Sequence, residues 1–154
     1  MTLTYKRATI EDIDLLTKTR IEVLRAANRL SDDTDLSEVE IQSYNYYQKA
    51  LRDDSHIAYL AFDGTRFVGA GAVSFFQVMP TYHNLSGNKA YIMNMYTRPE
   101  YRRRGIAIKI LDMLIKESKN RGITAISLEA TDMGRPLYEK YGFVKMDNEM
   151  ELPQ

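Results

Sequence analysis

Three consecutive arginines, Arg102 to Arg104, stand just before Gly105 and Ala107 in the stretch RPEYRRRGIAIKILDML, residues 98–114. Adjacent cations repel one another and a glycine at a helix start costs conformational entropy, so a bound anion would offset both. The N–H groups of a helix's first turn attract anions, and arginines bind phosphate oxygens through paired hydrogen bonds. Gly105 leaves the main chain open to a ligand. The stretch therefore predicts a phosphate site, and a pyrophosphate site in particular.

A simpler interpretation of the arginine run is a solvated basic loop that precedes a helix without any ligand. The expected strand–loop–helix context and the small residues after the arginines favour the phosphate site. The loop has neither the Gly-Lys-Ser/Thr of a Walker loop nor the three glycines of the dinucleotide fingerprint. A nucleotide-binding domain that uses this loop for ATP is therefore a weaker alternative.

The spacing of apolar residues places the arginine loop between a strand and a helix. Residues 90–97 are typical of a strand, and the helix that begins near Gly105 is expected to end at Gly122. The apolar residues of this helix fall fully at helical spacing: Ala107, Ile110, Leu111, Leu114 and Ile115. Residues 123–130 then predict a buried strand, and residues 135–141 a short helix with a proline in its first turn.

The rest of the chain supplies further helices and strands. Thr9 with Asp12, and Ser37 with Glu40, have the spacing of capping boxes at two helix starts. The expected elements are a strand over 3–8, a helix over 10–27, a helix from Ser37 to about Leu51, strands over 56–62 and 67–78, and one or two strands within 143–152. Together they predict a mixed α/β domain of about seven strands.

Composition limits the functions open to the chain. Of its 154 residues 44% are hydrophobic, and its 21 basic residues balance 21 acidic ones. We expect a single domain over residues 1–154, with no bulk affinity for nucleic acid or membranes. The lack of cysteine excludes disulfides, thiolate metal sites and a cysteine nucleophile, and no metal site is expected. Without a signal-peptide core or a long apolar run, the protein is expected to be soluble and cytoplasmic.

Two motifs resemble those of a known enzyme family. The stretch MYTRPEYRRRGIAIKIL, residues 95–111, is similar to the acetyl-CoA signature of the GNAT superfamily of N-acetyltransferases, Arg/Gln-x-x-Gly-x-Gly/Ala. Further along, LYEKYGF, residues 137–143, resembles the family's second motif. The resemblance implies a GNAT-like α/β (α+β) fold: a mixed, mostly antiparallel sheet of about seven strands with a splayed central parallel pair, flanked by about four helices.

The resemblance also implies that acetyl-CoA is the cosubstrate. In the family, the strand before the phosphate loop carries a bulge and diverges from the next parallel strand, and pantetheine enters the gap between them. Met95, Tyr96 and Thr97 would then contact the pantetheine arm and the thioester, largely through main chain. The implied pyrophosphate-binding residues are Arg102, Arg103, Arg104, Gly105, Ile106 and Ala107.

Two positions depart from the family pattern. Thr131 stands where the family often has an asparagine that bonds pantetheine, and threonine can form that bond but reaches less far. Arg135 stands where a small residue is common, so the cofactor would be held differently there. Thr131 is therefore still expected to contact the cofactor.

The implied reaction is direct attack of a neutral amine on the acetyl thioester within a ternary complex, with the oxyanion met by the Met95 N–H. Tyr138 matches the family tyrosine that protonates the departing CoA thiolate, although a packed aromatic is its simpler interpretation. Glu129 is the candidate base, acting directly or through water. Asp132 could equally cap the next helix, and His83 has a suitable intrinsic pKa but is more typical of a loop surface.

The acceptor is a primary amine, of a small molecule or of a peptide or protein, that the sequence does not identify. In the family the segment between the first two helices helps to choose it, and here Asp32, Asp33 and Asp35 would favour a cationic amine. A solvated acidic loop is the simpler interpretation, and for Tyr82 and Tyr91 packing is simpler than an acceptor pocket.

Two further hypotheses follow from the resemblance. A non-catalytic acyl-CoA-binding or regulatory module with the same fold is an alternative to the enzyme, although the intact arginine loop and Tyr138 argue against it. A homodimer that pairs through the C-terminal strands is compatible with the resemblance, but nothing in the sequence demands it.

Overall fold

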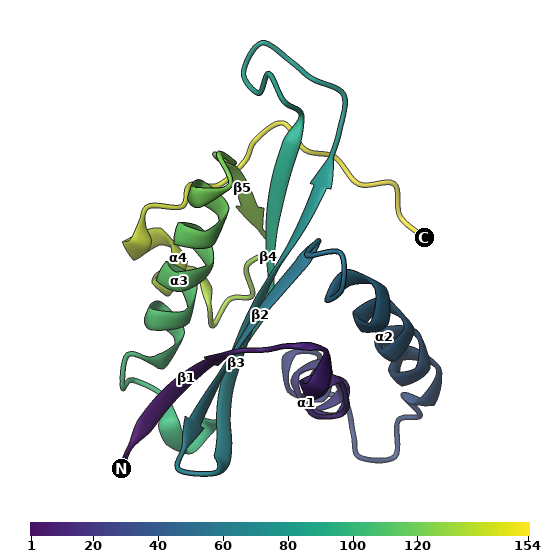
Figure 1. Cartoon of the computed structure of the whole chain (residues 1–154), viewed down its shortest axis with the longest axis vertical. Coiled ribbons are helices and arrows are strands. Elements are labelled where there is room, and N and C mark those ends of the chain that lie inside the picture. Colours follow the sequence, from purple (N-terminus) through teal and green to yellow (C-terminus); the bar gives the residue numbers. More distant parts are fainter.

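The computed structural model describes residues 1–154 and places five strands in one sheet with helices on both faces (Figure 1). The strands are β1 (Leu3–Arg7), β2 (His56–Asp63), β3 (Arg66–Gln77), β4 (Asn88–Thr97) and β5 (Ala125–Leu128). The helices are α1 (Ile13–Ala27), α2 (Ser37–Ala50), α3 (Ile106–Asn120) and α4 (Arg135–Tyr141), with 3₁₀ turns at Ile10–Asp12 and Pro99–Tyr101. Neighbouring strands follow chain order and are antiparallel, except for the parallel pair β4 and β5. The predicted mixed, mostly antiparallel sheet is confirmed.

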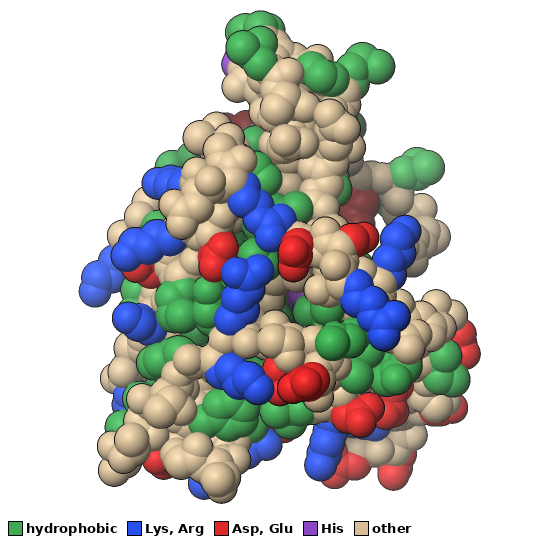
Figure 2. Space-filling model, viewed as in Figure 1, with side chains coloured by type: hydrophobic (Ala, Val, Ile, Leu, Met, Phe, Trp, Pro, Cys, Tyr) green, Lys and Arg blue, Asp and Glu red, His purple; other side chains and the backbone are tan.

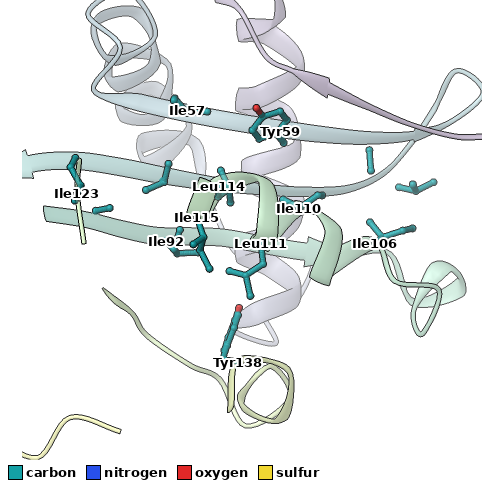
Figure 3. Packing of buried hydrophobic residues seen from close by; sticks show 14 of the residues in the cluster. Ile57, Tyr59, Ile92, Ile106, Ile110, Leu111, Leu114, Ile115, Ile123 and Tyr138 are labelled. Carbon is teal, nitrogen blue, oxygen red and sulfur yellow. The ribbon is translucent and has the colours of Figure 1, made fainter. Parts of the chain in front are cut away.

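The alternation of side chains along β2 explains why helices cover both faces of the sheet. Ile57 and Tyr59 belong to the apolar cluster under α3, whereas Ala58 and Leu60 belong to the cluster under α1 and α2. Figure 3 shows the first cluster, in which the side chains of α3 lie against the sheet. The fully buried apolar side chains of α3 are Ile106, Ile110, Leu111 and Leu114. Burial of Ile110, Leu111 and Leu114 is what the helical spacing predicts, whereas Ile106 is buried in place of the expected Ala107, which is half-buried. Burying these side chains fixes α3 on this face.

The middle of β4 carries a bulge. Pairing with β3 is regular up to Met93 and resumes at Tyr96, so residues 94–95 face the single residue Gly71. Asn94 takes a φ of +59°, a left-handed conformation that side-chain-bearing residues rarely adopt. The family resemblance predicts this bulge. The bulge turns the second half of β4 away from the direction of its first half.

Gly71 is required opposite the bulge because α3 approaches the sheet closely there. A Cβ at this position would lie 2.5 Å from both Ile110 Cγ2 and Met95 Sδ. The missing side chain therefore lets α3 and the bulged strand pack together, a requirement of neighbouring elements rather than of local conformation.

β4 and β5 pair only at their beginnings. The parallel register runs from Lys89 with Ala125 to Ile92 with Leu128, and residues 93–97 have no strand partner on that edge. The main chain of the second half of β4 is therefore free on the side that faces away from β3. This is the splayed parallel pair that the resemblance predicts.

Several predicted helix ends are confirmed. Thr9 and Asp12 form the capping box at the start of the first helical segment. At the end of α3, Gly122 takes a φ of +76°, and the Ile123 N–H donates to the Ser118 carbonyl oxygen over 3.0 Å. This is the Schellman arrangement, which favours glycine because of the positive φ.

The expected seven strands are corrected to five. No strand forms after Gly142: residues 143–154 are irregular, and the chain end runs beside the sheet without joining it (Figure 1). The segment Asp147–Glu149 interrupts its apolar alternation, and Val144 and Leu152 stay exposed. A strand is stable only when one face is buried against a core, so this segment lacks the driving force to pair.

The capping box expected from Ser37 and Glu40 is also wrong. Ser37 is the first residue of α2 rather than its cap, and its N–H donates to Asp35 Oδ1 over 2.9 Å. The aspartate therefore satisfies the helix terminus from a position two residues earlier than the Ser-x-x-Glu spacing suggests.

The surface separates charges that cancel in sum. Figure 2 shows lysines and arginines along the edge that α3 forms, and acidic side chains over the connection between α1 and α2. None of the helices combines the length and the apolarity needed to cross a bilayer.

Candidate active site

The loop between β4 and α3 has the conformation of an anion site. Arg103 has a φ of +64° and Gly105, the residue before α3, a φ of +81°. The first hydrogen bond of the helix is donated by the Lys109 N–H to the Gly105 carbonyl oxygen over 3.1 Å. The N–H groups of residues 105–108 have no protein acceptor. These donors and the positive end of the helix dipole together suit a phosphate group.

The arginines of the loop point to different partners. Arg102 Nε donates to the Thr97 carbonyl oxygen over 3.2 Å, while the Arg104 guanidinium lies 5.2 Å from the centre of the Tyr101 ring. Arg103 is exposed and forms no ion pair or hydrogen bond. All three guanidinium groups remain accessible at the start of α3, so they raise the local positive potential without blocking the main chain.

A cleft opens where β4 and β5 diverge; we call it the β4–β5 cleft. It has a volume of about 140 Å³. Its lining residues are Arg20, Val23, Leu24 and Ala27 of α1, Ile92 to Met95 of β4, Glu129 and Thr131 after β5, and Tyr138 of α4. The cleft therefore brings together Met95, Glu129, Thr131 and Tyr138, which the sequence analysis singled out from three separate segments.

Tyr138 is held in the cleft by the short helix α4. The residue is only 8% exposed and packs against Gly134, where an added Cβ would lie 3.0 Å from its ring. Its hydroxyl forms no hydrogen bond within the protein, and Figure 3 shows it directed toward the sheet. Burial raises the pKa of Tyr138 above its ordinary value of 10.0, so the hydroxyl is a proton donor at neutral pH.

Glu129 and Thr131 follow β5 and differ in what they can do. Glu129 is exposed; burial, and then the charge of Glu129, raise the pKa of Tyr91. Thr131 Oγ1 accepts a hydrogen bond from the Gly134 N–H over 3.2 Å and so helps to shape the turn before α4. The Thr131 hydroxyl proton is left to donate to a ligand.

The side chains of the last residues of β4 alternate between the two faces. Met95 packs with the α3 cluster, whereas Tyr96 packs with the α1 cluster, where burial and then Glu22 raise its pKa to about 12. Thr97 Oγ1 is buried without a hydrogen-bond partner. Contacts from Met95 and Tyr96 to a ligand in the cleft would therefore be made by main chain.

An ion pair fixes α1 against the loop that follows β4. The Arg98 guanidinium donates to both carboxylate oxygens of Glu22 over 2.9 Å, and these hydrogen bonds lower the pKa of Glu22. Because α1 lines the cleft and the arginine loop follows Arg98 directly, this pair links the two parts of the candidate site.

Several other candidates lie outside the cleft. His83 is exposed near the tip of the β3–β4 hairpin, with its ring centre 3.8 Å from that of Tyr82, and lines neither the β4–β5 cleft nor a second cavity beneath α2. Asp132 is exposed and forms no capping hydrogen bond with α4. Tyr91 also lies outside both cavities, as do Asp32, Asp33 and Asp35.

A second cavity, which the sequence analysis missed, lies beneath α2 and measures about 280 Å³; we call it the α2 cavity. Its lining includes Tyr46 of α2, His56 of β2, Ser74 of β3 and Arg20 of α1. It shares Arg20, Met93 and Asn94 with the β4–β5 cleft, so the two cavities meet at the bulge. One signal could have pointed to it: His56 shares the α1–α2 face of the sheet with Ala58 and Leu60, where a polar residue is unusual.

The arrangement of these residues can bind a phosphorylated ligand and can donate a proton to it. Free main-chain donors at the start of α3 suit a pyrophosphate, the unpaired edge of β4 suits an extended polar chain, and Tyr138 can donate a proton inside the cleft. The first two features suit the binding of a CoA thioester, and the third suits protonation of the CoA thiolate when the thioester is cleaved.

Comparison with known proteins agrees with this geometry. A solved structure from Clostridium acetobutylicum, described as a predicted acetyltransferase with acetyl-CoA, superposes with a TM-score of 0.90 at 34% identity over 99% of this chain and 96% of that one. A GCN5-related N-acetyltransferase from Ralstonia eutropha JMP134 superposes with a TM-score of 0.85 at 25% identity over 99% of both chains.

Sequence comparison leads to the same family. The chain is 30% identical over 98 residues to YsnE of Bacillus subtilis (strain 168), described as an uncharacterized N-acetyltransferase; the match covers 60% of this chain and 59% of that relative. The model of the Acetyltransferase (GNAT) family matches residues 23–143, which include the arginine loop, Tyr138 and every lining residue of the β4–β5 cleft except Arg20. The chain therefore belongs to the GNAT family of acetyltransferases.

Proposed function

We propose that the protein transfers an acetyl group from acetyl-CoA to a primary amine by direct attack within a ternary complex. The observation that carries the proposal is the junction of two features: the free N–H groups of residues 105–108 and the unpaired edge of residues 93–97. The first suits a pyrophosphate and the second an extended pantetheine arm. The acetyl-CoA in the Clostridium acetobutylicum structure supports the choice of cosubstrate, and the name of the Bacillus subtilis relative supports an amine acceptor.

The roles of the residues follow from their places in the site. Arg102 to Ala107 would hold the pyrophosphate, and the main chain of Met95 to Thr97, with the Thr131 hydroxyl, would hold the pantetheine arm. The Met95 N–H would donate to the oxyanion, since Met95 lies in the bulge and in the part of β4 that has no partner on the β5 side.

Two side chains would move protons. Tyr138, kept protonated by burial, would protonate the departing thiolate. Glu129, at the mouth of the cleft, would accept the proton of the amine directly or through water.

The test is thermal unfolding of the purified protein with acetyl-CoA, CoA, ATP and NAD at several concentrations. A ligand that binds only the folded state adds about 2.7 kcal/mol to stability when present at about 100 times its dissociation constant. We expect stabilisation by acetyl-CoA and CoA, and acetylation of at least one amine in a panel. Stronger stabilisation by ATP than by either CoA form would favour a nucleotide-binding domain, and CoA binding without any transfer would favour a non-catalytic module.

The chain offers a matched pair of variants for this test. Gly105 and Gly122 stand at opposite ends of α3 with φ values of +81° and +76°, and neither has any atom within 4 Å of an added Cβ. Gly105→Glu and Gly122→Glu should therefore strain the backbone alike. Only Gly105→Glu places a carboxylate beside the phosphate site, so only this variant should lose stabilisation by acetyl-CoA. Equal retention in both variants would contradict the proposed binding loop.

A further inference from the structure

The α2 cavity contains one cation and no carboxylate. Arg20 is the only arginine or lysine in its lining, and no aspartate or glutamate lines it. Arg20 Nη1 donates to Asn94 Oδ1 over 3.0 Å, but the side chain forms no ion pair within 4.0 Å. Arg98, by contrast, is fully paired with Glu22 of the same helix as Arg20. A partly buried guanidinium without a counter-ion keeps donors for an anion.

His56 provides a second, independent observation in the same cavity. The residue is 4% exposed, and its Nδ1 lies 2.9 Å from the Tyr46 hydroxyl and 3.3 Å from Ser74 Oγ. Its Nε2 is buried without any hydrogen-bond partner. Burial, and then the nearby Arg20, lower the pKa of His56 to about 4, so the ring is neutral at physiological pH. Because Nε2 is closed off from the cavity, the polar atoms that this group offers to a ligand are the hydroxyls of Tyr46 and Ser74, both of which line the cavity.

The position of the cavity connects these groups to the reaction. Arg20, Met93 and Asn94 line both the α2 cavity and the β4–β5 cleft, so a molecule seated in the cavity touches the wall of the cleft. The acidic side chains Asp32, Asp33 and Asp35, which would attract a polycation, line neither cavity. The charge around the acceptor side of the bulge is therefore positive rather than negative.

We propose that the α2 cavity binds the acceptor, and that the acceptor is a primary amine carrying a compact anion, a carboxylate or a phosphate, which pairs with Arg20. This inference rests on the proposed acetyl transfer and adds the chemical class of its acceptor. The anion pairs with the guanidinium, the hydroxyls of Tyr46 and Ser74 beside His56 form hydrogen bonds to the same molecule, and the amine lies toward the shared wall at Met93 and Asn94. Arg20 is a specificity-determining residue in this arrangement, because it would repel polyamines and other polycations.

The experiment compares amines that differ only in the anion. Protein saturated with CoA is titrated with O-phosphoethanolamine against ethanolamine, with β-alanine against β-alaninamide, and with spermidine, and binding is followed by calorimetry. In parallel, kcat/KM for acetyl transfer is measured with the same compounds. We expect the anion-bearing member of at least one pair to bind at least about tenfold more tightly, the effect of one charge-assisted hydrogen-bonded pair.

Three variants locate the preference. Arg20→Gln should remove the difference within the pair, and Arg20→Lys should keep part of it because the charge remains. Lys18→Gln is the matched control, since it removes one positive charge from an exposed position of the same helix outside both cavities and should keep the full preference. If Arg20→Gln does not fold, the wild-type pairs and Arg20→Lys still decide the question.

The outcomes separate this inference from the proposed function. Stabilisation of the wild type by acetyl-CoA, together with equal binding of both members of each pair, would overturn the inference and leave acetyl transfer standing. Preference for spermidine, binding of none of the anion-bearing amines, or an unchanged preference in Arg20→Gln would overturn it as well. Absence of any stabilisation by acetyl-CoA would instead overturn the proposed function, and the inference with it.

Discussion

The two cavities on either side of the β4 bulge differ in how the fold builds them. The β4–β5 cleft exists because two strands stop pairing after Ile92, and main-chain groups form much of its binding capacity. The α2 cavity exists because side chains from α1, α2, β2, β3 and β4 converge. A cavity made by main chain tolerates changes of side chain, whereas one made by convergent side chains can acquire a new specificity through a single substitution. The first arrangement suits an invariable cosubstrate and the second a variable acceptor.

The two cavities also differ in the charged and titratable side chains that line them. Glu129 and the protonated Tyr138 lie in the cleft, and Arg20 and the neutral His56 line the α2 cavity, with Arg20 shared at the wall between them. In the proposed mechanism, proton transfer would take place in the cleft and anion recognition in the α2 cavity. Acid should therefore disturb the α2 cavity through protonation of His56.

The largest effect we expect is acid destabilisation through His56. Its pKa is about 4 in the folded protein and about 6.5 in the unfolded chain, so the unfolded state binds a proton first as the pH falls. The stability contributed by the neutral ring is complete above pH 6.5 and is lost between about pH 6.5 and pH 4, by about 3 kcal/mol. Denaturant unfolding at pH 7, 6, 5 and 4 measures it.

Two variants test the assignment of this pH dependence to the α2 cavity. His56→Gln should flatten the change between pH 6.5 and pH 5, where most carboxylates with lowered pKa values are still ionised. His83→Gln alters the other histidine, which is exposed, and should leave the slope unchanged. The same slope in His56→Gln as in the wild type would place the pH dependence elsewhere.

A slightly smaller effect is expected for Tyr138→Phe in the cleft. Loss of the proton donor should reduce kcat about a hundredfold, equivalent to about 2.7 kcal/mol, while stabilisation by acetyl-CoA persists. Because burial raises the pKa of Tyr138, the wild-type rate should not fall from this group until the pH exceeds 10. Steady-state kinetics at several pH values measure both effects.

The matched control for this prediction is Tyr141→Phe. Tyr141 lies on the same short helix, donates to Asp112 Oδ1 over 2.9 Å and does not line the cleft. Its variant loses one hydroxyl from α4 without touching the reaction. Equal rates for Tyr138→Phe and the wild type would remove the tyrosine from the mechanism and leave only its packing role.

The contrast between the cavities also explains what the sequence could predict. The arginine loop, Gly105 and helix α3 form one continuous segment, so their local pattern predicts both the helix and the free donors at its start. Tyr138 could be predicted as a site residue only through the family motif. It is far from β4 along the chain, so the sequence alone does not indicate that the two are close in space. Arg20 and His56 belong to no motif. The alternation around His56 marks it as a polar residue on a buried face, but nothing in either local sequence indicates that the two residues line the same cavity.

The errors in the fold have similar physical causes. The strands expected after Gly142 depend on whether a partner edge and a buried face are available, which local alternation cannot report. At α2, Asp35 and Ser37 both have side chains suited to capping, and the spacing Ser37–Glu40 could not decide between them. Sequence patterns thus predict an element well where its hydrogen bonds and caps lie within one segment. They predict it poorly where its pairing or packing partner is distant along the chain.

The smallest effect we expect concerns the ion pair between Glu22 and Arg98, which holds α1, the helix that lines both cavities. Glu22→Gln breaks the paired hydrogen bonds between Glu22 and Arg98. Because both side chains are about one-third exposed, the loss should cost about 1 kcal/mol of stability. The exposed pair Arg66 and Glu100 is the control, and Glu100→Gln should cost less because solvent screens that pair more strongly. Thermal unfolding of both variants gives the difference.

If α1 serves as a common wall, Glu22→Gln should also weaken acetyl-CoA and acceptor binding by similar small factors, since Arg20 and Val23 on the same helix line the cleft. A loss confined to acetyl-CoA would show instead that the ion pair acts only on the loop after Arg98. The cavities would then be independent across the bulge, and the acceptor specificity set by Arg20 could change without any cost to binding of the cosubstrate.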